Sequence, residues 1–390
     1  MLPLGYCTNV HAGLTVAAVE QGLDQFTVPI QQRVGRPIAA GLWLAAPVIQ
    51  ELLADPAGLT RFVQGLKRRD LVCYTLNAFP YGNFHDERVK EQVYLPDWTQ
   101  PERLTYTQGC AEVLARLLPE GETGSISTVP LGFKGLADKP DFLANCVDQL
   151  LALAVTLRNL HQETGRLIRL AIEPEPCCVL ETTAETRSFF ELLFNVAEER
   201  SQGEVAREHL GVCYDVCHQS VEFEDVAASI RDLTAEGIRI NKLHITCALE
   251  LREPAGHPEA REALAAFAEP RYLHQTFAWT REPSQDTIRH LVDLTPEFAS
   301  QPPTEFLNAD CWRIHFHAPV NAEALGPLTT TRADLITALK TLPELPYLPH
   351  LEVETYTWNV LPGAERPDLV SGIADELIAT QKLLDEVGIG

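Results

Sequence analysis

Four acidic or imidazole side chains stand at the ends of apolar, strand-like stretches of this chain. They are Glu173, Asp215, His244 and Glu354. Three carboxylates gathered around one imidazole would repel one another unless a divalent cation lay among them. Oxygen and nitrogen ligands of this kind suit Mn, Mg, Co or Zn, and open positions leave room for water or a substrate. The four residues therefore predict a divalent-metal site, provided that the fold brings them together.

The stretch around Glu173 indicates how the fold does so. Side chains alternate along a strand, so Ile168, Leu170 and Ile172 point one way while Ala171 and Glu173 point the other. In a TIM barrel a bulky face meets the outer helices, and the residue at the strand end lies at the C-terminal mouth, where barrel enzymes keep their chemistry. The alternative is an edge strand that runs into a charged turn.

The order of elements along the chain also favours a barrel. Strand-like and helical patterns alternate, which predicts a parallel sheet with right-handed crossovers. We expect strands at residues 4–9, 37–44, 71–76, 125–129, 168–173, 210–215 (running on to 218), 241–246 and 351–356, and helices at 14–33, 47–69, 141–164, near 182 onward and at 369–386. Thr182 with Glu185 is a capping pair for the helix near 182. The predicted fold class is α/β, a (β/α)8 TIM barrel with a large insertion between strands seven and eight.

We predict that residues 1–390 form one domain and that 248–345 form an insertion or lid within it. About a hundred residues separate the last two barrel strands, far more than a βα loop needs. A helix is expected at 259–267, a strand at 272–277, a helix near 286–299 and a further strand at 312–319. That last stretch could instead be a barrel strand. Its His315 and His317 share one face, and we expect them to fold over the barrel mouth rather than face solvent.

Further polar residues are candidates for binding substrate or a second metal. Lys242 shares the inward face of its strand with His244, and His218 follows Asp215 by three residues. His85 lies in an aromatic-rich loop, 77–98, that resembles a substrate-covering loop, the alternative being a plain surface loop. Glu352 and Glu354 are about 6–7 Å apart along one face, so one of them reaches the metal, and we expect Glu354.

Composition limits the partners. The net charge of −23 disfavours nucleic acid and anionic membranes. No apolar run reaches the roughly 18 residues of a membrane span, and the first residues lack the features of a secretion signal, so we expect a cytoplasmic location. The 10 cysteines are scattered, and most are read as reduced core residues. A small-molecule substrate is the expected partner, and the oligomeric state does not follow from the sequence.

The order of the four residues resembles a known superfamily. A strand-end Glu, an Asp with His three residues later, a His and a Glu is the pattern of the xylose-isomerase-like TIM barrels, which include sugar isomerases, sugar 3-epimerases, inositol-pathway enzymes and DNA-repair enzymes of the endonuclease IV type. The resemblance implies that Glu173, Asp215, His244 and Glu354 bind the metal. It also implies that Glu173 and Glu354 act as acid and base, and that His218 contacts substrate or a second metal.

A second resemblance is more specific. Residues 6–11, 77–82 and 351–358 are similar to the sugar-isomerase-like proteins of bacterial Ebo metabolite-traffic clusters. This implies a role in such a pathway, without implying a reaction.

Three functional hypotheses follow. The first is a metal-dependent isomerase or epimerase that acts on a polyhydroxy or α-hydroxy-carbonyl compound. The second is a multi-zinc hydrolase of a small phosphate ester, which would use His85, His218, His315 and His317 for further ions. The third is a metabolite-binding protein without turnover. The number of bound metal ions separates the first two.

Overall fold

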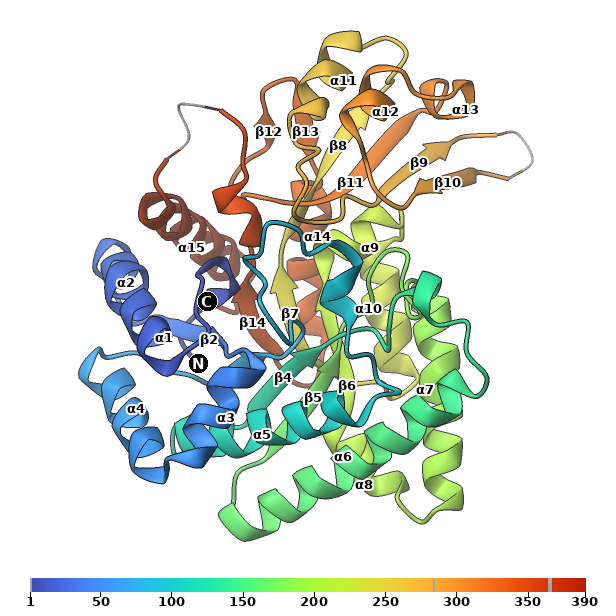
Figure 1. Ribbon diagram of the computed structural model, residues 1–390. Coiled ribbons are helices and arrows are strands. Elements are labelled where there is room, and N and C mark those ends of the chain that lie inside the picture. The colour runs from blue at the N-terminus through green and yellow to red at the C-terminus, as the bar shows by residue number, and fades with distance from the viewer. Residues whose placement is uncertain (1, 283–284, 364–366) are drawn as a thin grey trace.

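Eight parallel strands close into a barrel within the described part of the chain, residues 2–282, 285–363 and 367–390 of a computed structural model (Figure 1). Their order around the barrel is β1-β14-β7-β6-β5-β4-β3-β2. The strands are β1 (Gly5–Cys7), β2 (Ala39–Trp43), β3 (Thr75–Asn77), β4 (Gly124–Thr128), β5 (Ile168–Ile172), β6 (Leu210–Asp215), β7 (Ile240–Ile245) and β14 (His350–Val353). The predicted barrel fold is therefore confirmed.

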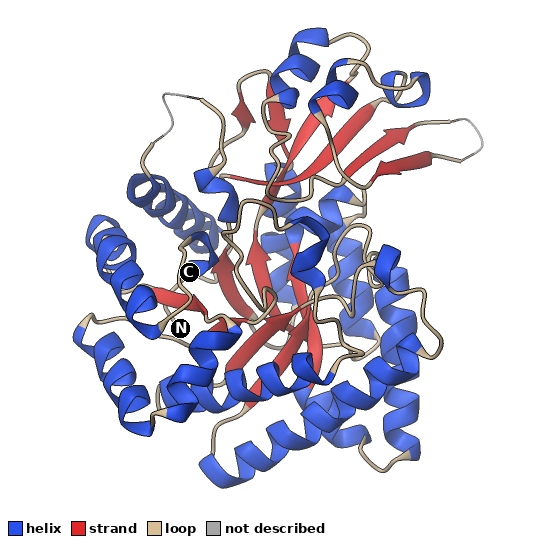
Figure 2. Cartoon of the chain, in the orientation of Figure 1, coloured by secondary structure: helices blue, strands red, loops and turns tan. Residues whose placement is uncertain are grey.

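Helices cover the outside of the barrel (Figure 2). They are α1 (Val16–Gly22), α2 (Val28–Val34), α3 (Ala46–Ala54), α4 (Pro56–Arg68), α5 (Pro101–Leu117), α6 (Phe142–Thr164), α7 (Thr183–Glu199), α8 (Gly203–His209), α10 (Val226–Ala235), α14 (Arg332–Thr341) and α15 (Leu369–Glu386). A short helix, α9 (Val216–Val221), instead follows β6 at the mouth of the barrel. The outward residues of β5, Ile168, Leu170 and Ile172, are completely buried. Helix α7 begins with the predicted capping box of Thr182 and Glu185.

The residues between β7 and β14 form a second, six-stranded sheet in the order β10-β9-β11-β8-β13-β12. Its strands are β8 (Cys247–Arg252), β9 (Thr276–Thr280), β10 (Thr287–Leu291), β11 (Cys311–Ala318), β12 (Ala324–Leu325) and β13 (Leu328–Thr330), with short helices α11 (Pro258–Ala265), α12 (Pro296–Ser300) and α13 (Thr304–Leu307). Only Thr246 separates β7 from β8, so this sheet rises from the C-terminal end of the barrel (Figure 1). Residues 312–319 thus lie in the second sheet, not in the barrel, while the boundaries 248–345 stay a prediction.

Three predicted elements were wrong. The helix expected near 286–299 is instead strand β10, which pairs antiparallel with β9, followed by the single turn of α12. The helix expected at 47–69 divides at Asp55, because Pro56 disfavours a helical conformation in the residue before it. The chain does not run on as a strand to His218, since Asp215 caps α9 there.

Other features were not expected. Helices α5, α10 and α14 had no counterpart in the prediction. The helix expected at 14–33 contains a π-helical segment, η2 (Leu23–Thr27), between α1 and α2. All 10 cysteines are free and buried, in agreement with the expected reduced core. No helix in the described ranges combines the length and apolarity that a membrane crossing requires.

Glu376 joins the last helix to the barrel mouth. It lies fully buried on α15 and accepts hydrogen bonds from the Val320 amide (2.9 Å), the Thr355 hydroxyl (2.7 Å) and the Trp358 indole (2.7 Å). Burial raises the pKa of its carboxyl to about 7, although these donors oppose the rise. One side chain therefore holds the segment after β11 and the loop after β14 against α15.

We predict that Glu376→Ala lowers the free energy of unfolding by about 2–4 kcal/mol, because three buried donors lose their acceptor. Chemical denaturation measures this change. Glu386→Ala, on the exposed end of the same helix, is the control and should stay within about 0.5 kcal/mol of the parent protein. Equal stability of both variants would contradict the assigned role.

Candidate functional site

The four predicted residues meet at the C-terminal mouth of the barrel. Glu173 directly follows β5, Asp215 is the last residue of β6, His244 lies near the end of β7, and Glu354 directly follows β14. These four strands are neighbours in the barrel. The four residues are at most 4% exposed, so their charges are not screened by water.

The Nδ1 atom of His244 is the point on which the carboxylates converge. It lies 2.9 Å from Glu173 Oε1, 3.0 Å from Glu354 Oε2 and 3.5 Å from Asp215 Oδ2. A ring nitrogen carries at most one hydrogen, so it cannot satisfy three acceptors. Glu173 Oε2 and Asp215 Oδ2 are buried and lack a hydrogen-bond partner among the described residues. This donor set fits a divalent cation, and binding of one stays a prediction.

The other ring nitrogen of His244, Nε2, faces a buried ion pair between Glu352 and Lys242. Nε2 lies 3.1 Å from Glu352 Oε2, and Lys242 Nζ lies 2.6 Å from the same oxygen. If Nε2 donates its hydrogen to Glu352, the Nδ1 lone pair faces the three carboxylates. A histidine oriented by a carboxylate in this way is typical of metal ligands. Lys242 therefore lies beneath the mouth and does not line the cavity described below.

The pKa shifts in this cluster follow from burial and from the contacts between His244 and the carboxylates. Burial would lower the pKa of His244, but Cys213, Glu173 and Glu354 raise it well above its usual value. Burial raises the pKa of Glu173 to about 7. Burial would also raise the pKa of Glu354, but His244 and His317 lower it to about 2.

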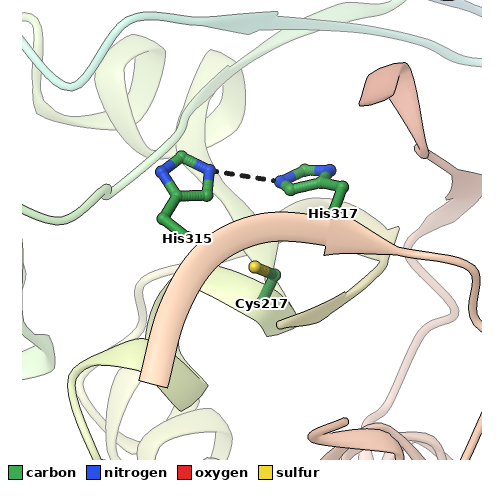
Figure 3. Close-up of side chains that lie close together, drawn as sticks. All are labelled: Cys217, His315 and His317. Carbon is green, nitrogen blue, oxygen red and sulfur yellow. Dashed lines mark hydrogen bonds between the residues drawn. The ribbon is translucent and has the colours of Figure 1, made fainter. Parts of the chain in front are cut away.

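Three further imidazoles form a second cluster beside the first. His218 Nε2 lies 3.1 Å from His315 Nε2. Figure 3 shows the contact of His315 Nε2 with His317 Nε2, which are 3.3 Å apart. Each Nδ1 faces an oxygen, on Pro174, Gln275 and Glu354 respectively, at 2.9, 2.8 and 2.6 Å. If each Nδ1 donates to its oxygen, three Nε2 lone pairs point at one another. Such an arrangement also fits a cation.

An irregularity in β11 presents two of these histidines. Ile314 pairs with Leu249 of β8 and Ala318 pairs with Cys247, so four steps along β11 match two along β8. Bulges of this kind re-aim side chains. The Cys217 thiol, on α9, also lies near His315 and His317: ligand atoms of these three residues are within 4.8 Å of one another (Figure 3).

Asp215 lies between the two clusters. Its Oδ1 accepts hydrogen bonds from the His218 amide (3.1 Å) and the Thr246 hydroxyl (2.6 Å), which hold the carboxylate in place. Its Oδ2 lies 3.5 Å from His244 Nδ1, 3.9 Å from His317 Nε2 and 4.0 Å from His218 Nε2. One carboxylate oxygen can therefore serve both positions.

A cavity of about 520 Å³, which includes space open to solvent, lies over both clusters. Five residues of the two clusters line it, and we call this end of the cavity the floor: Glu173, Glu354, His218, His315 and His317. His85 does not line it; His85 Nε2 lies 2.7 Å from the backbone carbonyl of Asn9.

Several residues of the site were missed by the sequence reasoning. Glu175, two residues after Glu173, lines the cavity and accepts a hydrogen bond from the Tyr94 hydroxyl at 2.7 Å. Gln275 donates to the same hydroxyl at 3.1 Å and orients His315. The pairing of Glu175 with Glu173 in an alternating Glu-Pro motif was a usable signal for Glu175, whereas nothing in the local sequence marks Gln275.

Searches for relatives gave structural matches only. No family model and no curated protein matches the chain. Among solved structures, the chain is similar to a xylose isomerase-like TIM barrel protein from Mycobacterium smegmatis in complex with magnesium, at 10% identity and a TM-score of 0.47, over 100% of this chain and 98% of that one. It is similar to a D-tagatose 3-epimerase-like protein at 10% identity and a TM-score of 0.49, over 99% and 98%.

A third match is the IolI protein with a bound zinc atom, at 13% identity and a TM-score of 0.47, over 99% of this chain and 98% of that one. The chain is a (β/α)8 barrel. That assignment rests on its own strand order, because likenesses at these scores carry no argument about activity.

We predict different effects for the two glutamates of β14 and the loop after it. Glu354→Gln should abolish stoichiometric metal binding, because it removes a ligand at the mouth. Glu352→Gln should keep stoichiometric metal at saturation, with affinity weaker by about 10–100-fold, and should destabilise the metal-free protein by about 3–5 kcal/mol because Lys242 loses its buried partner. Elemental analysis and denaturation measure the two effects, and the reverse ranking of metal loss would contradict the assignment.

Proposed function

We propose that this chain is a divalent-metal-dependent isomerase or epimerase that acts on a small molecule with an α-hydroxy-carbonyl or polyhydroxy group. The observation that carries the proposal is the convergence of three buried carboxylates on one nitrogen of His244. In this proposal Glu173, Asp215, His244 and Glu354 hold the ion, which is Mn, Zn, Mg or Co. A divalent cation held there would act as a Lewis acid toward substrate oxygens.

Proton transfer in this reaction falls to the two glutamates, which differ in their contacts. Glu354 Oε1 accepts hydrogen bonds from the amides of Asn9 and Asn77, each at 2.8 Å, and its Oε2 faces His244. Glu173 has a buried Oε2 without a partner among the described residues and borders the cavity. We therefore assign the removal of the substrate proton to Glu173. Glu354 would position the opposite side of the substrate.

The chemistry can be tested by deuterium exchange. Metal-loaded protein in D2O, incubated with a panel of ketoses and other α-hydroxy-carbonyl compounds, should place deuterium on the carbon beside the carbonyl, as measured by NMR. Glu173→Gln should reduce the exchange rate by at least about 100-fold, the scale of a lost general base.

Metal content is measured on each sample, so that loss of the ion is separated from loss of the base. Glu191→Gln, an exposed residue of α7, is the matched control and should exchange at the parent rate. An unchanged rate in Glu173→Gln would contradict its role, and no exchange with any compound by the metal-loaded parent would contradict the isomerase proposal.

The second cluster favours one other candidate, a multi-zinc hydrolase of a small phosphate ester. What supports it is the set of three Nε2 atoms on His218, His315 and His317 beside the shared Asp215. The net charge of −23 disfavours a nucleic-acid substrate for such a site.

We predict that a His315→Ala, His317→Ala double variant separates the two functions. Loss of one metal equivalent together with phosphatase activity would favour the hydrolase. Full metal content with weakened ligand binding would assign both histidines to the substrate of the isomerase. Elemental analysis reads the first outcome and calorimetry the second. A double variant unchanged in both would show that the pair only supports the second sheet.

We also propose that the chain is related to two groups of proteins, one within the other. The pattern of Glu173, Asp215 with His218, His244 and Glu354 supports a place in the xylose-isomerase-like superfamily. Residues 6–11, 77–82 and 351–358 support kinship with the sugar-isomerase-like proteins of Ebo metabolite-traffic clusters. In that setting a protein that binds its metabolite without turnover would have the same metal ligands, and the deuterium experiment distinguishes it from an isomerase.

A further inference from the structure

The walls of the cavity are built from aromatic rings. Among the described residues that line it are Phe79, Phe84, Tyr94, Tyr272 and Tyr356. The rings of Phe84, Tyr272 and Tyr356 contact one another, with centroids 4.9, 5.5 and 5.0 Å apart. Phe79 packs against Tyr94 at 5.8 Å. A ligand that enters this cavity therefore meets ring surfaces before it reaches the floor.

Two of the three tyrosine hydroxyls on these walls already have partners. The Tyr94 hydroxyl donates to Glu175 at 2.7 Å, and the Tyr272 hydroxyl donates to the backbone carbonyl of Phe84 at 3.3 Å. A hydroxyl that is buried without a hydrogen bond costs free energy. Walls of this kind consequently disfavour a ligand whose body carries many hydroxyl groups.

The positively charged group on the wall is also engaged. Lys90 Nζ lies 2.6 Å from Asp293 Oδ2 and 3.4 Å from the carbonyl of Glu269, and the side chain is largely buried. It is therefore neutralised by the second sheet and does not present a free cation to a ligand phosphate or carboxylate.

The floor has the opposite character. Glu173, Glu354, His218, His315 and His317 all border the cavity there. Asn9 and Asn77, which also line the cavity, donate to Glu354, and Glu175 lies 3.5 Å from His315, so these polar side chains belong to the same end. Most of the polar lining therefore gathers where the proposed metal positions lie, and the aromatic rings line the remainder.

We infer that the ligand of this cavity is amphipathic: a flat, apolar ring system forms its body, and two adjacent oxygens at one end chelate the metal. This inference rests on the proposed metal centre and narrows its substrate class. A ring body gains contact with the faces of Phe84, Tyr272 and Tyr356, whereas a sugar chain of the same size would leave hydroxyl groups unpaired against them.

Three hydroxamates test the inference, because they share one chelating group and differ in the body attached to it. Acetohydroxamate carries a methyl group, benzohydroxamate a phenyl ring and gluconohydroxamate a polyhydroxy chain. Calorimetry on metal-loaded protein measures each affinity, corrected for the affinity of the same compound for the free ion. We expect benzohydroxamate to bind at least about tenfold more tightly than acetohydroxamate, and gluconohydroxamate to bind no more tightly than acetohydroxamate.

Phe84→Leu tests whether the preference for the phenyl compound comes from the cavity wall, since this variant keeps an apolar side chain and removes the ring. It should reduce the ratio of benzohydroxamate to acetohydroxamate affinity by about threefold or more at unchanged metal content. Phe298→Leu is the matched control, because Phe298 packs against Phe306 and Trp312 in the part of the chain that carries the second sheet and does not line the cavity. Its ratio should equal that of the parent protein.

The outcomes distinguish failure of this inference from failure of the proposed metal-dependent function. Equal binding of the ring and methyl compounds, tighter binding of gluconohydroxamate, or no binding of any compound to protein that holds metal would overturn the ring preference alone. Protein that takes up no metal would overturn the proposed function and this inference together.

Discussion

The structure depends on the placement of negative charge inside the barrel mouth. Glu173, Asp215 and Glu354 point at one nitrogen of His244, and all four residues are buried. Carboxylates in such surroundings are stable only when positive charge or hydrogen-bond donors face them. Below the mouth, Lys242 meets this need for Glu352. At the mouth, a divalent cation is the group that would meet it.

The second sheet extends the same centre. Because β7 continues into β8 after one residue, the sheet stands over the strand ends and brings β11 to the mouth. His315 and His317 thereby reach His218, which follows the shared carboxylate of Asp215 on α9. The two clusters are therefore not independent: Asp215 belongs to both, and the backbone carbonyl of Glu354 accepts a hydrogen bond from His317.

Polarity is divided between floor and walls of the cavity. The floor concentrates carboxylates and imidazoles, whereas the walls present aromatic rings, and the hydroxyls of Tyr94 and Tyr272 among them are already bonded. In the proposed function, reaction chemistry and ligand selection therefore belong to different elements. The barrel strands would supply the first through Glu173 and Glu354. The loop after β3 and the second-sheet region would supply the second through Phe84 and Tyr272.

The sequence by itself determined the features that depend on local periodicity. Alternation along each strand places Glu173 or His244 on the inward face, and strand ends in a parallel barrel share one rim, so the four converging residues could be predicted. Tertiary structure decided what depends on contacts distant in sequence. Residues 287–291 became a strand because β9 was there to pair with it. Gln275 joined the site because β11 brought His315 to it, and Lys242 was drawn below the cavity by Glu352, its neighbour only once β7 and β14 are paired. Such pairings arise from closure of the chain on itself, which no short stretch of sequence encodes.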